Sequence, residues 1–236
     1  MNPYDEFAVE EALLVRDKFP GSEITLITLG PETCRDVLKT GLAMGADKAI
    51  HLNDTAFDRL DNQGAAYLLA QAIRTLSFDL VLCGRQAVDD DMAGAGSALA
   101  MFLGIPFVSV VTQLKLSKPQ GALESPLVAT VTRQIEGGSE EIEAVLPVLL
   151  TCQKGLNVPR LPSLKGIMAA KKKEIIVLDA KAIGFDPQNP GAAFNRVRQV
   201  DLALPPLRKK GRILAGSSEE TARELVRILR EEEKVI

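Results

Sequence analysis

The residues Ile24-Thr-Leu-Ile-Thr-Leu-Gly-Pro31 predict a β-strand over 24–29 that ends at a glycine–proline turn, because the run is apolar and rich in β-branched side chains. Residues 34–44 follow with apolar side chains at helical spacing, and a second short strand is expected over 48–52. The same alternation continues in a helix over 62–76 and a strand over 80–83. It favours an α/β fold in which helices cover both faces of a mostly parallel sheet.

The segments on either side extend this pattern. Asn2-Pro3 is interpreted as the cap and first-turn proline of a helix over 4–18. The remaining elements are expected as helices over 93–103 and 218–232, as strands over 108–116, 127–135, 142–145, 148–152 and 174–178, and as an irregular stretch over 153–170. We therefore expect a doubly wound α/β domain with a β-rich insertion in residues 1–175, and a C-terminal arm and helix in residues 176–236.

Composition excludes several classes of function. The 236 residues carry 28 basic and 31 acidic side chains, a formal charge of −3 that gives no overall reason to expect nucleic acid as a partner. No apolar run is long enough to cross a bilayer, and acidic residues from Asp5 onward argue against a targeting segment. We expect no direct membrane insertion.

Residues that carry metal or acid–base chemistry are scarce. The three cysteines, Cys34, Cys83 and Cys152, are far apart, so neither a zinc site nor a disulfide framework is expected, and a reducing compartment fits better. His51, the single histidine, lies between apolar neighbours and is interpreted as a structural residue at the end of a strand.

Ligands of open parallel sheets bind beyond the carboxyl ends of the strands. One such edge is Leu29-Gly30-Pro31, and another is the run from Gly84 to Gly96. Small residues over 93–97 let the backbone approach a phosphate where a helix begins, although these residues alone favour a tight contact between helix and sheet. The adjacent carboxylates of residues 89–91 either point away, one of them capping the helix, or hold a divalent cation. The run Lys171-Lys-Lys173 is interpreted as a solvated edge.

Four blocks of sequence together resemble a known family. They are Met-Asn-Pro-Tyr-Asp-Glu-Phe-Ala-Val-Glu-Glu-Ala-Leu at the start, Gly84-Arg-Gln-Ala-Val-Asp-Asp-Asp91, the stretch from Val131-x-Arg133-x-x-Glu136-Gly-Gly138 to Pro147-x-Leu-Leu-Thr151, and Pro159-Arg-Leu-Pro-Ser-Leu164 through Ile-Met168 to Lys173. In this order and spacing they resemble the β subunit of electron transfer flavoproteins. The C-terminal third resembles the family only in outline.

The resemblance implies a carrier of electrons and not an enzyme. The subunit would have an adenine-nucleotide-binding α/β fold of the HUP type, form a heterodimer with an α subunit that holds most of an FAD, and itself bind AMP. Backbone N–H groups of residues 90–96 would hold the phosphate. The residues implied at the nucleotide are Asn2, Pro3, Tyr4, Asp5, Leu29, Val81, Cys83, Gly84, Gln86, Asp90, Asp91, Met92, Ala93, Gly94, Ala95 and Gly96.

The resemblance also implies partners. A docking loop over 153–173, with Pro159, Arg160 and a projecting Leu164, would contact acyl-CoA or other flavin dehydrogenases, and Arg133 and Gln134 would face the flavin. Electrons would pass on to the electron transfer flavoprotein–quinone oxidoreductase or an equivalent acceptor, in the bacterial cytoplasm.

Three departures from the family pattern bear on these expectations. Family members usually have a further strand ahead of the Asn2-Pro3 motif, so a truncated start and a sheet without its central strand are expected. Ala93-Gly-Ala-Gly96 stands where the family usually has a glutamine that donates to the phosphate, and Gln134 stands where a carboxylate is common.

Three other functions are alternatives to AMP-binding electron transfer. The nearest is an electron-bifurcating relative that holds a second FAD in place of AMP; such proteins usually have Asp-Gly-Asp where this chain has three aspartates, and the extra carboxylate would repel a diphosphate. An ATP-pyrophosphatase-like enzyme would need a Ser-Gly-Gly loop, which is absent from the sequence. A universal-stress-like nucleotide sensor leaves the β-rich region and the Leu164 segment without a role.

Overall fold

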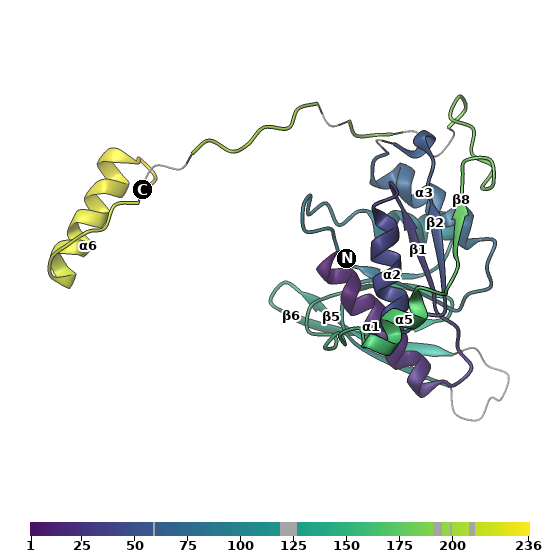
Figure 1. Ribbon diagram of the computed structural model, residues 1–236. Coiled ribbons are helices and arrows are strands. Elements are labelled where there is room, and N and C mark those ends of the chain that lie inside the picture. The colour runs from purple at the N-terminus through teal and green to yellow at the C-terminus, as the bar shows by residue number, and fades with distance from the viewer. Residues whose placement is uncertain (59, 119–126, 191–194, 199, 208–210) are drawn as a thin grey trace. The chain divides into compact units, whose positions relative to one another are not determined.

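The computed structural model describes the chain except residues 59, 119–126, 191–194, 199 and 208–210, so parts of the expected C-terminal arm lie outside the described residues (Figure 1). The chain divides into two compact units, Met1–Arg198 and Gln199–Ile236. The first unit extends past the expected boundary at residue 175, because the strand that starts there pairs inside it.

The first sheet consists of three parallel strands in the order β1-β2-β8, with β1 at Thr25–Leu29, β2 at Lys48–Leu52 and β8 at Ile175–Leu178. Helix α2, Cys34–Met44, lies in front of this sheet in Figure 1. Alternate residues of β2 face opposite sides: Ala49 packs with α2, while Ile50 packs on the other side of the sheet.

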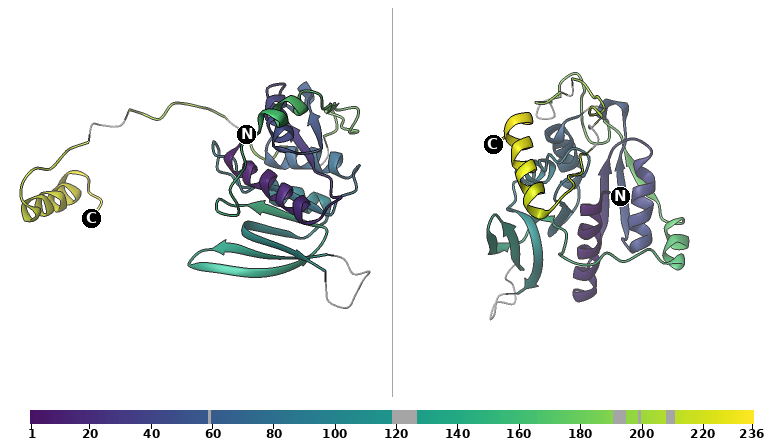
Figure 2. Two further views of the ribbon diagram at one scale, coloured as in Figure 1. Left: turned by 60° about the horizontal axis from the view of Figure 1, so that its bottom comes forward. Right: turned by 90° about the vertical axis from the view of Figure 1, so that its left-hand side faces the viewer.

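The second sheet has the order β3-β7-β4-β5-β6. Strand β7 pairs in parallel with both β3 and β4, whereas β4, β5 and β6 are antiparallel. The teal β5–β6 hairpin extends from the body of this unit (Figure 2). The strand bounds are Leu80–Gly84 for β3, Phe107–Ser117 for β4, Val128–Ile135 for β5, Gly138–Val145 for β6 and Val148–Cys152 for β7. The expected α/β class with a β-rich extension is confirmed.

The parallel strands form two sheets, which agrees with the expected sheet without its central strand. Strand β1 is an edge of the first sheet and β3 an edge of the second, and no strand in the described part of the chain pairs with either free edge. Every residue of β1 and β3 is only half-buried, although both strands are apolar, whereas all five residues of β7 are buried. The two strands thus lack the second neighbour that central strands of such folds have.

Helices pack on both sides, as expected for a doubly wound fold. Helices α1, Pro3–Lys18, and α2 share a core with α5, Leu164–Ala170. On the other side lie α3, Asn62–Ile73, and α4, Ala95–Leu103, with the short 3₁₀ turn Thr55–Phe57.

The Asp61 carboxylate caps α3 by accepting from Gly64 N at 2.8 Å. It also accepts from the backbone of Arg196 and, at 2.9 Å, of Val197. One side chain therefore begins a helix and holds residues 196–197, near the end of the first unit.

The start of α1 agrees with expectation: Asn2 is its N-cap residue and Pro3 lies in its first turn, although the Asn2 side chain makes no capping bond and donates to the Gln86 carbonyl instead. Two other local expectations are wrong. Helix α4 starts at Ala95 because Ala93 has φ 51°, a left-handed conformation that a helix does not accommodate. The irregular stretch contains α5, whose cap is Ser163, with Gly166 N donating to Ser163 Oγ at 3.0 Å.

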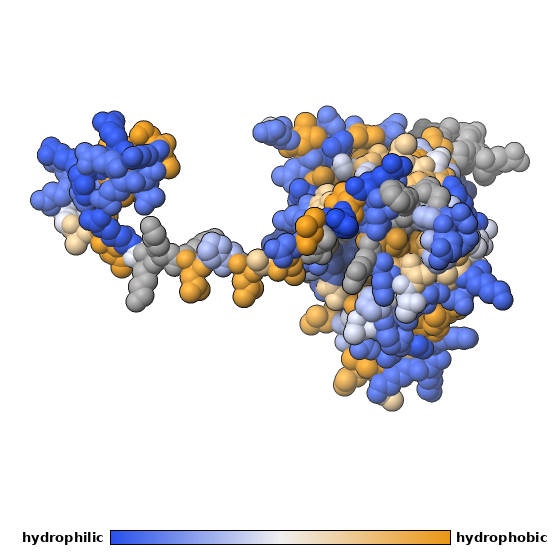
Figure 3. Space-filling view, turned by 90° about the horizontal axis from the view of Figure 1, so that it is seen from above, coloured by the Kyte–Doolittle hydropathy of each residue, from blue (hydrophilic) through white to orange (hydrophobic). Residues whose placement is uncertain are grey.

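The second unit contains α6, Ser218–Arg227, followed by a turn over Ile228–Glu232. Ser217 and Glu220 form a capping box at the start of α6. The segment before it exposes apolar side chains along its length, among them Leu202, Leu204 and Leu207. Orange, hydrophobic atoms are visible along this segment in Figure 3. Among the described residues, no helix combines the length and apolar character needed to cross a bilayer.

Candidate functional site

The start of α1 and the end of β3 bring together residues about eighty positions apart in the sequence. Asp5 Oδ1 accepts a hydrogen bond of 2.6 Å from Gly84 N, and Asn2 Nδ2 donates to the Gln86 carbonyl at 2.9 Å. The contact is close enough that a Cβ at Gly84 would lie 2.8 Å from Asp5 N and from the carbonyl carbon of Tyr4. Pro3 and Tyr4 complete this first turn of α1. These sequence-predicted residues therefore share one site.

Two polar groups at this site differ in how they are satisfied. Burial raises the pKa of Asp5, although the Gly84 N–H and the Asn2 side chain act in the opposite direction. The Asn2 Oδ1 atom is buried and has no hydrogen-bond partner within the described structure. A buried amide oxygen without a donor is uncommon, so Asn2 has an open acceptor position for a ligand.

The acidic loop after β3 is shaped by its own carboxylates. Asp89 Oδ1 accepts from Asp90 N at 2.9 Å, and Asp90 Oδ1 accepts from Met92 N at 3.0 Å. Gln86 Nε2 donates to Asp91. All three aspartates are exposed, and the N-cap of α4 is Gly94, so the expectation that one of them caps the helix is wrong. They fold the loop.

The start of α4 supports both interpretations of its small residues. A Cβ at Gly96 would lie 2.6 Å from Thr151 Cγ2 and 3.1 Å from Cys83 Sγ, so the helix packs tightly on the sheet. The N–H groups of Ala95 and Gly96 have no acceptor in the parts of the chain that the structure describes, and Gly94 supplies no side-chain cap. Free N–H groups at a helix start attract anions. The N–H groups of residues 90–92 are bonded within the loop and are not free in this way.

Other residues implied at the nucleotide are divided between the two sheets. Val81 and Cys83 of β3 pack against a cluster with Leu149, and burial raises the pKa of the Cys83 thiol to about 12. Leu29 of β1 belongs to a different cluster, on the first sheet. His51 is fully buried next to it, with Nε2 2.9 Å from the Gly30 carbonyl oxygen. His51 thereby fixes the turn that follows β1.

A second polar group lies at the ends of β5 and β7. Gln153 Nε2 donates to Gln134 Oε1 at 3.4 Å, and Arg133 lies 3.9 Å from Glu140 on the neighbouring strand. Two buried atoms of this group, Arg133 Nε and Gln153 Oε1, have no partner among the described residues. One is a donor and the other an acceptor, so a molecule bound here has both kinds of hydrogen bond available.

The expected docking segment projects its apolar side chains. Leu164 is the first residue of α5, and its side chain is 84% exposed. Val158 and Leu161 are also exposed, whereas Pro159 is half-buried. Arg160 is directed the other way, onto Glu10 of α1.

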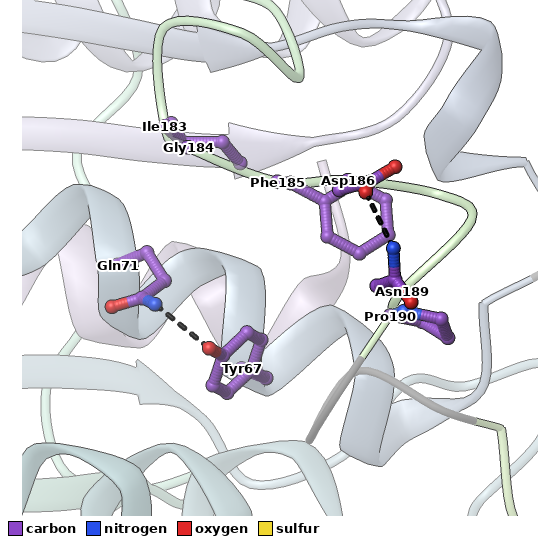
Figure 4. Close-up of a pocket in the computed structure, with 8 residues that line it drawn as sticks. All are labelled: Tyr67, Gln71, Ile183, Gly184, Phe185, Asp186, Asn189 and Pro190. Atoms are coloured by element: carbon purple, nitrogen blue, oxygen red, sulfur yellow. Dashed lines mark hydrogen bonds between the residues drawn. The ribbon is translucent and has the colours of Figure 1, made fainter.

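Two cavities lie elsewhere. One of about 100 Å³ is lined by α3 and residues 183–190, where Gln71 donates to Tyr67 and Asn189 to Asp186 (Figure 4). The other, about 500 Å³, has Asp58, Phe185 and Arg198 among its lining residues. None of the residues implied at the nucleotide lines either cavity. The candidate nucleotide site is therefore identified by its hydrogen-bonding groups.

The family model described as electron transfer flavoprotein domain matches residues 1–183. The chain belongs to the electron transfer flavoprotein family. Curated relatives agree: a protein of Bacillus subtilis (strain 168) named electron transfer flavoprotein subunit beta is 37% identical over all of this chain and 88% of its own length. A protein of the same name from Megasphaera elsdenii is 38% identical over 90% of this chain and 78% of its own length.

A further relative carries a different name. The caffeyl-CoA reductase-Etf complex subunit CarD of Acetobacterium woodii is 38% identical over 98% of this chain and 86% of its own length. The family's role is electron transfer in association with flavin, and its members are carriers. The α/β fold with its parallel strands agrees with this membership.

Four residues contact the expected docking segment or the expected flavin-facing residues, although the sequence alone did not identify them. Glu10, Glu11 and Asn157 hold the expected docking segment, and Gln153 contacts Gln134. Glu10 and Glu11 lie between the buried apolar residues of α1, and two acids at such positions are a signal that sequence reasoning can use. Their partners are about 150 residues away and leave no local signal.

Proposed function

We propose that this chain is the β subunit of a heterodimeric electron transfer flavoprotein. It accepts electrons from acyl-CoA or other flavin dehydrogenases and passes them to a quinone oxidoreductase or equivalent acceptor, in the bacterial cytoplasm. The names of its relatives, which include the words subunit beta, support an α partner. FAD, held mainly by that partner, supplies the redox chemistry when bound.

The observation that carries this proposal is the pair of unpartnered buried atoms at the ends of β5 and β7. Arg133 Nε and Gln153 Oε1 remain without hydrogen bonds although each costs free energy when buried alone. A flavin or an α-subunit group held against Arg133, Gln134 and Gln153 would give both atoms a hydrogen-bond partner. These side chains would then orient the flavin, and the positive charge of Arg133 would favour negative charge on it.

The AMP part of the proposal rests on the contact between α1 and β3. The free N–H groups of Ala95 and Gly96 would hold the phosphate, and Asn2 Oδ1 would accept from the nucleotide. Because Asp90 and Asp91 are engaged in bonds of the loop, they form its wall.

A test is to co-express the chain with an α subunit and count the nucleotides released on denaturation. Equal amounts of FAD and AMP are expected. Twice as much FAD with no AMP would replace the AMP proposal with the second-FAD alternative. Arg133→Met should lower FAD retention, while Arg35→Met, which removes an arginine of α2 that pairs with Glu32, should not.

Docking is tested separately with Leu164→Ala. Because Leu164 is 84% exposed, the variant should fold, dimerise and retain flavin as the wild type does, yet accept electrons more slowly from the donor dehydrogenase. The matched control is Met101→Ala, which truncates an exposed apolar side chain on α4. Equal transfer rates in the two variants would remove the docking role of Leu164.

A further inference from the structure

The segment before α5 has no regular secondary structure, but it is fastened to α1 by directional bonds. Arg160 Nε donates to both carboxylate oxygens of Glu10, at 3.1 and 2.9 Å, and its second guanidinium nitrogen donates to Glu10 Oε1 at 2.9 Å. The backbone N–H of Arg160 donates to the same carboxylate at 3.0 Å. One carboxylate thus fixes both the side chain and the main chain of Arg160.

A second attachment to α1 is made by Asn157, three residues before Arg160. Asn157 Nδ2 donates to Glu11 Oε2 at 2.9 Å and to the Phe7 carbonyl at 3.0 Å. Both acids of α1 are buried, with Glu10 only 4% exposed. Buried carboxylates are costly unless they are paired and hydrogen-bonded. Four bonds to Glu10 satisfy that requirement and restrict how Arg160 can lie on the helix.

The other end of the segment is seated on α2. A Cβ at Gly166 would overlap the carbonyl oxygen of Ala43 and lie 3.3 Å from its carbonyl carbon, so α5 lies directly on the end of α2. Leu161 and Leu164, both exposed, lie between this seat and Arg160. The two attachments flank the apolar side chains and leave them projecting into solvent.

We propose that Glu10 is a positioning residue for partner docking: through Arg160 it holds Leu161 and Leu164 in one orientation on the rigid base formed by α1. This inference rests on the proposed docking function of the segment. An anchor that is already ordered loses less entropy when it enters an apolar pocket of the donor dehydrogenase. Glu10 acts before the partner arrives and does not contact it.

The test uses the flavin-loaded heterodimer and steady-state reduction by a donor dehydrogenase. Glu10→Gln keeps the shape but removes the charge that holds Arg160, so the KM for the heterodimer should rise about tenfold, as expected when a charged hydrogen-bond network is weakened. The value of kcat should stay within about twofold, because the flavin and its surroundings are unchanged. Asp17→Asn is the matched control, because Asp17 contacts the same arginine at 3.3 Å but is exposed. The KM for the heterodimer that carries Asp17→Asn should equal that for the wild type.

Combination with Leu164→Ala distinguishes positioning from general loss of structure. In the Leu164→Ala background, Glu10→Gln should raise KM no further, since the side chain that it positions is gone. Arg160→Lys keeps the charge and loses the bidentate geometry, so it should raise KM as well. It replaces Glu10→Gln in this test if Glu10→Gln does not fold.

Each negative result has a separate meaning. An unchanged KM in Leu164→Ala overturns the proposed docking function. A raised KM in Leu164→Ala with an unchanged KM in Glu10→Gln overturns the positioning role of Glu10 alone, and so does an equal effect of Glu10→Gln in both backgrounds.

Discussion

Replacing Gly84 by alanine places one methyl group between β3 and the start of α1. The added Cβ would lie 2.7 Å from Asp5 Oδ1 and 2.8 Å from both Asp5 N and the carbonyl carbon of Tyr4. Two of these three atoms belong to the helix backbone and cannot rotate away. Since non-bonded carbon contacts are favourable at about 3.5 Å, the start of α1 must move by roughly 0.7 Å.

That displacement has two costs. Overpacking costs about 1–3 kcal/mol, and the 2.6 Å bond from Gly84 N to the buried Asp5 carboxylate, worth about 1.5–3 kcal/mol, is weakened. We expect Gly84→Ala to lower the free energy of unfolding by about 3–5 kcal/mol, a large part of the ~5–15 kcal/mol typical of proteins. In urea this moves the unfolding midpoint by more than about 1 M.

The assay is urea unfolding of the flavin-loaded heterodimer, followed by circular dichroism. Gly138→Ala is the control, because no atom lies within 4 Å of the Cβ position there. The wild-type midpoint should be retained in Gly138→Ala within experimental error. If Gly84→Ala unfolds at the same urea concentration as Gly138→Ala, the close contact between α1 and β3 is not a determinant of stability and the reasoning is refuted.

Three further predictions concern titration, reactivity and a helix cap. Burial raises the pKa of Asp5 above its ordinary 3.8, so the contribution of Asp5 to stability is fully present below pH 3.8 and is lost as pH rises through the raised pKa. Asp5→Asn should remove this loss of stability in urea titrations between about pH 4 and pH 8. An unaltered dependence of stability on pH in this variant would contradict the prediction. In the native protein, iodoacetamide should label Cys34 before Cys83, because desolvation raises the pKa of the Cys83 thiol to about 12, as peptide mass spectrometry would show; earlier labelling of Cys83 would contradict that desolvation. Asp61→Ala should cost about 1–2 kcal/mol and speed trypsin cleavage at Arg196, and unchanged cleavage would mean that the carboxylate does not hold that segment.

Local patterns were sufficient to predict most elements of the first unit. The runs of β1, β2 and β7 were located to within a residue: β1 by its β-branched side chains, and β2 and β7 by the continuous apolar run that a buried strand shows. Helix α5 was not predicted, because it has only seven residues and follows two prolines. Ser163 and the helical spacing of Leu164, Ile167 and Met168 were signals that could have identified it.

Long-range pairing was not predictable from the same patterns. The resemblance to the family indicated which segments form the candidate site, but not the bonds between Asn2 and the Gln86 carbonyl or between Glu10 and Arg160, which join residues 84 and 150 positions apart. The division into two sheets is different: the apolar sequences of β1 and β3 do not reveal it, but the resemblance to the family led us to expect a sheet without its central strand, and the free edges of β1 and β3 agree with that expectation.

The half-buried edges of β1 and β3 have a consequence for how the isolated chain behaves in solution. Every second backbone amide of an edge strand points away from its own sheet, so deuterium should replace those hydrogens in β1 and β3 much sooner than in β7. The same amides are templates on which a strand of another molecule can add. Neither strand carries a charged side chain to oppose this, so self-association of the purified chain would start at these two edges and would weaken when a strand-forming peptide is supplied in excess.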